Sequence, residues 1–123
     1  MPVGNEESFA VSVVVPTKLL FVCSRNQIRS LTAEKIFQGV PGIQVRSAGT
    51  QPNARVVVSE GHIGWADTIF VMEKSHLAKL RQKFGPALED KQVVVLRIPD
   101  EFTFMQQDLI DELQANVPEH LKI

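Results

Sequence analysis

The sequence predicts an α/β protein in which helices cover both faces of a parallel β-sheet. Short apolar runs that favour strands alternate with longer runs whose apolar residues have helical spacing. The first strand, residues 18–22, is apolar almost throughout, which is typical of a central strand buried on both faces. With 123 residues, 44% of them hydrophobic, the chain is long enough for one domain with a sizeable core.

Four strands are expected to alternate with four helices. The expected strands are residues 18–22, 43–46, 68–72 and 93–96. The expected helices are residues 29–38, 54–61, 74–84 and 105–117. Residues 47–50 are expected to form the turn after the second strand, and Gly85-Pro86 to end the third helix. The segment 54–61 carries mixed signals, because its valines favour a strand, but its place between two parallel strands favours a crossover helix.

The N-terminal residues 1–17 are assigned to an arm or extra strand ahead of a domain over residues 18–123. The apolar run 9–15, which stops at Pro16, favours β-structure. Exposed strand edges of this kind promote aggregation. The run is therefore expected to be an extra edge strand, an arm that docks on a partner chain, or a disordered tail. A homodimer formed through a docked arm is one arrangement that would cover the edge.

Composition narrows the range of partners. The formal net charge of −1 argues against a general nucleic-acid or membrane partner, because no basic excess neutralises phosphates. A single cysteine cannot form an internal disulfide, which favours a reducing compartment and hence the cytoplasm. We expect no signal peptide and no membrane span. No metal-ligand spacing is present, so we expect neither metal nor cofactor.

A polar loop follows the first strand, begins with Cys23 and ends with Arg29 and Ser30. Such a strand-to-helix loop points backbone N–H groups and the positive end of a helix dipole at one place, where an anion binds. The expected phosphate-binding residues are Ser24, Arg25, Asn26, Gln27, Ile28, Arg29 and Ser30. The guanidinium of Arg29 fits phosphate oxygens in a bidentate manner. A thiol and an anion site therefore share one loop.

Cys23 is the expected nucleophile, because a helix N-terminus and a neighbouring guanidinium stabilise its thiolate. Attack on phosphorus gives a phosphocysteine, which water then hydrolyses. The Ser30 hydroxyl can hydrogen-bond the thiolate and help sulfur leave phosphorus. No metal is required for this chemistry.

The leaving oxygen needs a general acid. Asp100, in the loop after the fourth strand, is the candidate, with Glu101 beside it. Phe102 and Phe104 follow, and we expect them to form the wall of a cleft for an aromatic substrate. His76 lies early in a predicted helix and is interpreted as a solvated residue without a catalytic role.

These residues resemble the low-molecular-weight protein tyrosine phosphatase family, whose loop reads Cys-X-Gly-Asn-X-Cys-Arg-Ser, followed by Pro-X-Ala-Glu. The matching residues are Cys23, Asn26, Arg29, Ser30, Ala33 and Glu34, with further matches at Ala54-Arg55 and in residues 45–50 and 67–72. The resemblance implies a three-layer α/β/α fold whose four parallel strands have the flavodoxin-like order 2-1-3-4. It also implies that Cys23 is the nucleophile, that Arg29 binds phosphate and that Asn26 braces the loop, with Ser47 as its partner.

The chain departs from the family at three loop positions and at the residue that follows the loop. Arg25 replaces a glycine, which suggests either strain or a slightly different loop shape. Gln27 replaces an apolar residue that borders the substrate, and Leu31 replaces the proline. Ile28 replaces the second cysteine, so the nucleophile has no disulfide partner.

Two further departures lie outside the loop. The segment after Thr50 is shorter than in the family, and Pro52 falls near the position of a histidine that supports the loop asparagine. In the family's Asp-Pro-aromatic motif the acid precedes the proline, where this chain has Ile98. Either Asp100 serves from the other side of the proline, or the enzyme lacks a strong general acid.

The leading hypothesis is a phosphomonoester hydrolase that acts on phosphotyrosine proteins or small aryl phosphates through a phosphocysteine. A phosphate-binding or regulatory module with little turnover is the alternative, favoured by the displaced acid and Arg25. Arsenate reduction fits poorly, because the disulfide relay of the related reductases needs further cysteines and the chain has only Cys23.

Overall fold

The computed structural model describes residues 15–121. The strands are β1 (Thr17–Cys23), β2 (Ile43–Gly49), β3 (Thr68–Val71) and β4 (Gln92–Val95). The helices are α2 (Arg29–Phe37), α3 (Glu60–Trp65), α4 (Lys74–Leu88) and α5 (Gln107–Asn116), followed by a short 3-10 helix, η1 (Pro118–His120). Of the predicted arm over residues 1–17, only 15–17 belong to the described residues.

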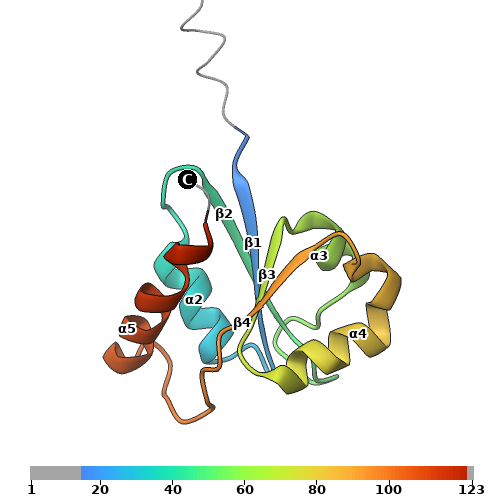
Figure 1. Ribbon diagram of the computed structural model, residues 1–123. Coiled ribbons are helices and arrows are strands. Elements are labelled where there is room, and N and C mark those ends of the chain that lie inside the picture. The colour runs from blue at the N-terminus through green and yellow to red at the C-terminus, as the bar shows by residue number, and fades with distance from the viewer. Residues whose placement is uncertain (1–14, 122–123) are drawn as a thin grey trace, which may run out of the picture.

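The four strands form one parallel sheet in the order β2-β1-β3-β4, which confirms the predicted fold. Helices α2 and α5 cover one face of the sheet, and α3 and α4 cover the other (Figure 1). The strands all run toward the bottom of Figure 1, so the loops that follow them meet at that end of the molecule. Ligands of open parallel sheets bind at this edge.

The central strand β1 is buried on both faces, as its apolar sequence predicts. Leu19, Phe21 and Cys23 point into the core beneath α2 and α5, whereas Leu20 and Val22 point into the core beneath α3 and α4. This alternation follows from the two-residue period of a strand. The Cys23 thiol therefore lies at the last residue of β1, on the side of the sheet that α2 covers.

The second strand is longer than predicted. Residues 47–49 do not turn away from the sheet but pair with residues 21–23 of β1. The small side chains of Ser47 and Ala48 let this stretch stay buried beside the end of β1. The strand therefore continues to the level of the thiol.

The predicted helix over residues 54–61 is mostly wrong. Residues 54–58 are not helical, and Val57 forms an isolated bridge with Gly49, in keeping with the preference of valine for extended backbone. The helix α3 starts only at Glu60, after Ser59, whose hydroxyl accepts a hydrogen bond from the His62 amide at 3.4 Å. A short helix is thus preceded by a connection of bends that pairs with the sheet only at Val57.

Helix α4 also differs, because it continues past Gly85 and Pro86 to Leu88. The backbone is kinked at Phe84, with φ −127° and ψ 22°, and Pro86 lies just after the kink. At such a place a proline interrupts few helical hydrogen bonds.

Helix α5 is shorter than its predicted span of 105–117 by two residues at its start and one at its end.

Gly49 is a position where the fold requires the absence of a side chain. A Cβ atom there would lie 2.5 Å from the carbonyl oxygen of Ser24 and 2.6 Å from the Cβ of Ala54. Such distances are well inside van der Waals contact. The close approach brings β2 and the segment after it against the loop that follows β1.

We predict that Gly49→Ala destabilises the protein by about 1–3 kcal/mol, because the added methyl group forces the packed backbone apart. Gly64→Ala is the matched control, since Gly64 lies in α3 and a methyl group added there would meet no atom of the described residues within 4 Å other than its chain neighbours and the backbone of its own helix. Urea unfolding of both variants measures the difference. Equal stability of the two variants would contradict this role for Gly49.

Candidate active site

The loop between β1 and α2 is held from outside by the segment that follows β2. Four hydrogen bonds satisfy consecutive carbonyl groups of the loop: Thr50 N to Cys23 O (3.0 Å), Gln51 N to Ser24 O (3.0 Å), Arg55 N to Arg25 O (2.9 Å) and Arg55 Nε to Asn26 O (3.1 Å). Because the carbonyl groups face this segment, the N–H groups of the loop are left for the opposite side. That side is where an anion would bind.

The loop turns through a left-handed residue at Asn26, with φ 59°. Asparagine tolerates this conformation better than most residues. Arg25, which takes the place of the family glycine, does not have a positive φ. The substitution of arginine for glycine therefore brings no left-handed strain to that position.

The thiol of Cys23 is buried and lies among hydrogen-bond donors. Its Sγ atom is 3.0 Å from the Oγ of Ser30 and 3.3 Å from the backbone nitrogen of Asn26. The Asn26 side-chain amide donates to the Ser30 Oγ at 2.7 Å, so the Ser30 proton is directed either to sulfur at 3.0 Å or to the Ala48 carbonyl oxygen at 3.4 Å. A thiolate would receive two hydrogen bonds in this arrangement.

Arg29 is 2% exposed and is fixed through one of its terminal nitrogens. Its Nη1 donates to the carbonyl oxygen of Ile98 at 2.8 Å and to the Glu73 carboxylate. The Nε and Nη2 edge, which is the edge suited to bidentate binding, remains for a ligand. On that side Nε lies 3.9 Å from the Asp100 carboxylate.

Glu73 and His76 join this network from the start of α4. The backbone N–H of Glu73 donates to Nδ1 of His76 at 3.0 Å, so the ring proton lies on Nε2, which is 2.9 Å from the Oγ of Ser24. Burial, aided by the positive charge of Arg29, lowers the pKa of His76 to about 4. A neutral His76 thus donates to Ser24 and leaves the serine proton free to reach a bound anion. The hydrogen bond from Arg29 lowers the pKa of Glu73.

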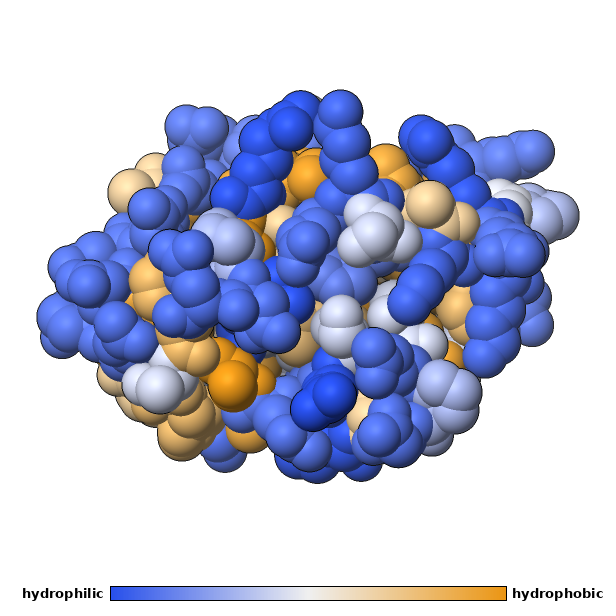
Figure 2. Space-filling model, turned by 90° about the horizontal axis from the view of Figure 1, so that it is seen from below, coloured by the Kyte–Doolittle hydropathy of each residue, from blue (hydrophilic) through white to orange (hydrophobic). Residues whose placement is uncertain are grey.

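The loop residues surround a cavity of about 240 Å³ at the edge where the strands end. It is lined by Cys23, Ser24, Arg25, Gln27, Ile28, Arg29, Gln51 and Asp100. Figure 2 looks onto this face, which is mainly hydrophilic with small apolar areas between polar side chains. The cavity brings the predicted nucleophile, the predicted arginine and Asp100 together.

Other predicted site residues lie elsewhere. The hydroxyl of Ser47 donates to the Glu34 carboxylate and not to Asn26, whose side chain contacts Ser30 instead. The Asn26 Oδ1 atom is buried without a hydrogen-bond partner among the described residues. Phe102 packs against the core beside α5, and Phe104 is 47% exposed, and neither lines the cavity. The expected aromatic wall is therefore absent from this cavity, as far as residues 15–121 are concerned.

Two residues of the network, Glu73 just before α4 and His76 in its first turn, are not evident from local sequence. His76 is expected to be solvated, but its side chain is 1% exposed. The residues next to Glu73 in the sequence give no sign that Glu73 belongs to the site. Both residues closely follow β3, and the rule that loops after parallel strands meet at one edge is the signal that places them near Cys23.

The comparisons with known proteins agree with this geometry. The family model described as "Low molecular weight phosphotyrosine protein phosphatase" matches residues 18–63. The match spans β1, the Cys23 loop, α2 and β2. It confirms, for this part of the chain, the family resemblance drawn from the sequence. No curated protein sequence matches the chain.

Solved structures with the same fold include several phosphatases. The YwlE arginine phosphatase from Geobacillus stearothermophilus has a TM-score of 0.63 and 22% identity, over 88% of this chain and 99% of that one. The low molecular weight protein tyrosine phosphatase SP-PTP from Streptococcus pyogenes has a TM-score of 0.69 and 16% identity, over 86% and 94%. The tyrosine phosphatase Wzb from Escherichia coli K30, in complex with phosphate, has a TM-score of 0.68 and 17% identity, over 83% and 94%. At these identities the likeness supports the fold.

Within residues 15–121, no helix is long and apolar enough to cross a membrane. The same residues contain no group of three or more His, Cys, Asp or Glu side chains arranged to hold a metal ion.

The low pKa of His76 predicts a pH dependence of stability. The unfolded chain takes up a proton at the ordinary histidine pKa of 6.5, whereas folded His76 does so only near about 4. Stability therefore falls as the pH drops from about 6.5 toward about 4, by at most about 3 kcal/mol. Urea unfolding between about pH 7 and pH 4.5 measures this slope. This pH range stays above the range in which protonation of Glu73, whose pKa is lowered, would remove its contribution to stability.

His76→Gln is the comparison variant for this experiment, because glutamine keeps an N–H donor near Ser24 but does not titrate. Its stability should fall less steeply over the same pH range. Parallel slopes in the two proteins would show that His76 does not carry the effect.

Proposed function

We propose that the protein is a cysteine-dependent phosphomonoester hydrolase that forms a phosphocysteine intermediate on Cys23. The observation that carries the proposal is the position of the thiol: its Sγ receives hydrogen-bond donors from Ser30 and Asn26 in the same cavity as the free edge of Arg29. A nucleophile, an anion clamp and a carboxyl group then surround one phosphoryl group. The family match over residues 18–63 supports the same chemistry.

In the first step the Cys23 thiolate attacks phosphorus, and the bond between phosphorus and the ester oxygen breaks. The Nε and Nη2 groups of Arg29, the loop N–H groups and the Ser24 hydroxyl bind the phosphoryl oxygens and stabilise the charge that moves onto them. The leaving oxygen takes a proton from Asp100, which lines the cavity. The products of this step are an alcohol or phenol and the phosphocysteine.

In the second step water attacks the phosphocysteine. The Asp100 carboxylate takes a proton from the water, phosphate forms, and the bond between sulfur and phosphorus breaks. The Ser30 hydroxyl, 3.0 Å from Sγ, stabilises the sulfur anion as it leaves. Cys23 and Asp100 are then ready for another cycle.

We propose phosphotyrosine proteins or other aryl phosphates as the substrate class. The family model is described by its phosphotyrosine activity, and Wzb and SP-PTP are tyrosine phosphatases. YwlE is an arginine phosphatase, and no aromatic residue of the described chain lines the cavity here. A panel of aryl phosphates and a phosphoarginine peptide separates the two substrate classes.

The second candidate is a phosphate-binding module with little turnover. It is favoured by the Oδ1 of Asn26, which has no partner within residues 15–121, and by the exposure of the Asp100 side chain, which is 65%. Both features reduce the rigidity of the site. A burst assay with an aryl phosphate separates the candidates, because a module binds phosphate but releases no stoichiometric burst of phenol.

Cys23→Ser is expected to abolish hydrolysis of an aryl phosphate, because a serine hydroxyl in this loop is a far weaker nucleophile than the thiolate. The variant should still bind inorganic phosphate, since the loop and Arg29 remain. Steady-state phenol release and phosphate titration by calorimetry measure the two properties. Full activity of Cys23→Ser would refute the phosphocysteine mechanism.

Asp100→Asn is expected to lower the rate by about 10²–10⁴ for substrates with poor leaving groups. Substrates with acidic phenols should be affected much less, because their leaving oxygen needs little protonation. The measurement is kcat/KM across a series of aryl phosphates in both proteins. Asp100 is excluded as the acid when the variant shows the same dependence on leaving group as the wild type.

A further inference from the structure

A second hollow of about 480 Å³ lies beside the catalytic cavity, between α4 and the segment that follows β2. We call it the α4 groove. Its floor contains Val58, Leu80 and Phe84, and Lys79 and Lys83 lie along it. These three floor residues belong to the core beneath α3 and α4. The groove therefore has an apolar base that rests on rigid packing.

The groove adjoins the catalytic cavity. Gln51 lines both, and its N–H is bonded to the Ser24 carbonyl of the catalytic loop. The positive charge of Lys79 also acts on His76, the partner of Ser24. A polypeptide whose phosphorylated side chain entered the cavity would thus pass directly over Gln51 into the groove.

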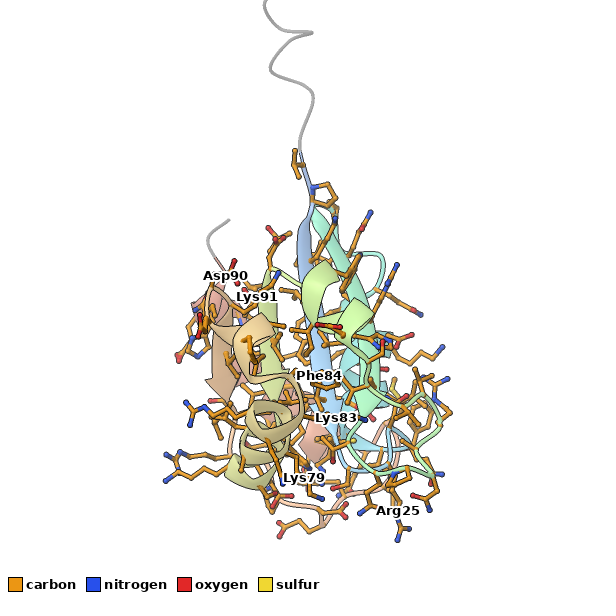
Figure 3. The ribbon with its side chains drawn as sticks, turned by 90° about the vertical axis from the view of Figure 1, so that its right-hand side faces the viewer. Arg25, Lys79, Lys83, Phe84, Asp90 and Lys91 are labelled. Atoms are coloured by element: carbon orange, nitrogen blue, oxygen red, sulfur yellow. The ribbon has the colours of Figure 1, made fainter. Side chains whose placement is uncertain are left out.

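The short connection after Thr50 leaves the groove open. α3 has only six residues, and residues 51–56 before it form turns and bends, so the lower part of α4 has no helix beside it within residues 15–121. In Figure 3, which looks onto α4, Phe84, Lys83, Lys79 and Arg25 lie in the lower half, toward the catalytic edge. Asp90 and Lys91 lie at the opposite end.

The charged side chains that line the groove are basic. Lys79 and Lys83 are exposed, and Arg25 lines the adjoining cavity. Within residues 15–121 none of these three side chains forms an ion pair with a carboxylate. No acidic residue of the described chain lines the groove. This basic edge is local, since the chain as a whole has a formal charge of −1.

We propose that the α4 groove binds the polypeptide segment next to the phosphorylated residue of a protein substrate, and that it selects acidic sequences. The carboxylates of the substrate face Lys79 and Lys83, which are exposed. The apolar floor forms only the base of the groove, because Val58, Leu80 and Phe84 are 3%, 1% and 9% exposed. The groove carries too few positive charges for a nucleic acid, which needs many phosphate contacts. The proposal rests on the proposed phosphatase function, because the catalytic cavity supplies the phosphate anchor.

Lys83→Glu tests the proposal, with Arg81→Glu as its matched control. Both substitutions reverse one charge on an exposed position of α4, but Arg81 does not line the groove. The substrates are a phosphotyrosine peptide with acidic and apolar flanking residues, the same peptide with basic flanking residues, and a small aryl phosphate. The measured quantity is kcat/KM for each enzyme and substrate.

For Lys83→Glu we expect kcat/KM to fall about threefold to tenfold on the acidic peptide. The basic peptide should improve, and the aryl phosphate, which does not reach the groove, should be unchanged. Arg81→Glu should leave all three within about twofold. Equal losses from the two variants, or an unchanged preference between the peptides, would overturn the groove as a recognition site.

Failure of the proposed phosphatase function can be told apart from failure of the groove. Binding of the acidic phosphopeptide to Cys23→Ser and to the double variant Cys23→Ser/Lys83→Glu is measured without any turnover. Weaker binding by the double variant supports the groove even when no peptide is hydrolysed. Identical affinities of the two variants refute it, whatever the catalytic activity of the wild type.

Discussion

A buried guanidinium needs partners for its charge and for its N–H groups, and Arg29 finds them in two loops that follow other strands. Glu73 comes after β3, and the carbonyl of Ile98 comes after β4. Arg29 itself lies at the start of α2, after β1. The side chain therefore joins three loops at one edge of the sheet. Its remaining edge is set toward the cavity before any ligand arrives, so little reorganisation accompanies binding of an anion.

The thiol depends on a second set of contacts that are shorter in range. Asn26 supplies a backbone N–H to Sγ and a side-chain donor to Ser30, and Ser30 in turn contacts Sγ. The left-handed backbone at Asn26 makes both contacts possible at once. Electrostatic anchoring by Arg29 and local hydrogen bonding by Asn26 are thus separate devices. Arg29 joins the loops around the cavity, and Asn26 holds the Cys23 thiol.

Much of this arrangement could be predicted from the sequence, because it follows from local rules. The apolar run of β1, the loop residues from Cys23 to Ser30 and the periodicity of α2 define the centre of the site. Strand order and the meeting of Asp100 with Cys23 follow from the rules of parallel sheets and from the family resemblance. Contacts that depend on the packing of distant side chains were not predictable in this way. His76 has the sequence context of an exposed helix start, and only the approach of α4 to the loop buries it.

The errors at Ser47 and at residues 54–58 have a common cause, because both segments pair with the sheet: Ser47 pairs with Phe21 of β1, and Val57 forms a bridge with Gly49 of β2. Small residues after a strand favour a turn, but pairing with the end of β1 is worth more than the local turn preference. β2 consequently reaches Gly49, and Ser47 faces Glu34 of α2. Phe102 and Phe104 are near Asp100 in sequence, yet the chain after Asp100 carries them toward α5 and solvent.

The hydrogen bonds from Thr50, Gln51 and Arg55 to the catalytic loop have a consequence for how the site opens. The loop cannot fray alone, because releasing its carbonyl groups also detaches the segment that walls the α4 groove. The Cys23 loop and the α4 groove thus form one cooperative unit of local unfolding. Amide protons of the Cys23 loop and of the segment after β2 should exchange with solvent through the same opening event. Local unfolding that starts in the Cys23 loop therefore also opens the α4 groove, and the reverse holds, while the β-sheet stays folded.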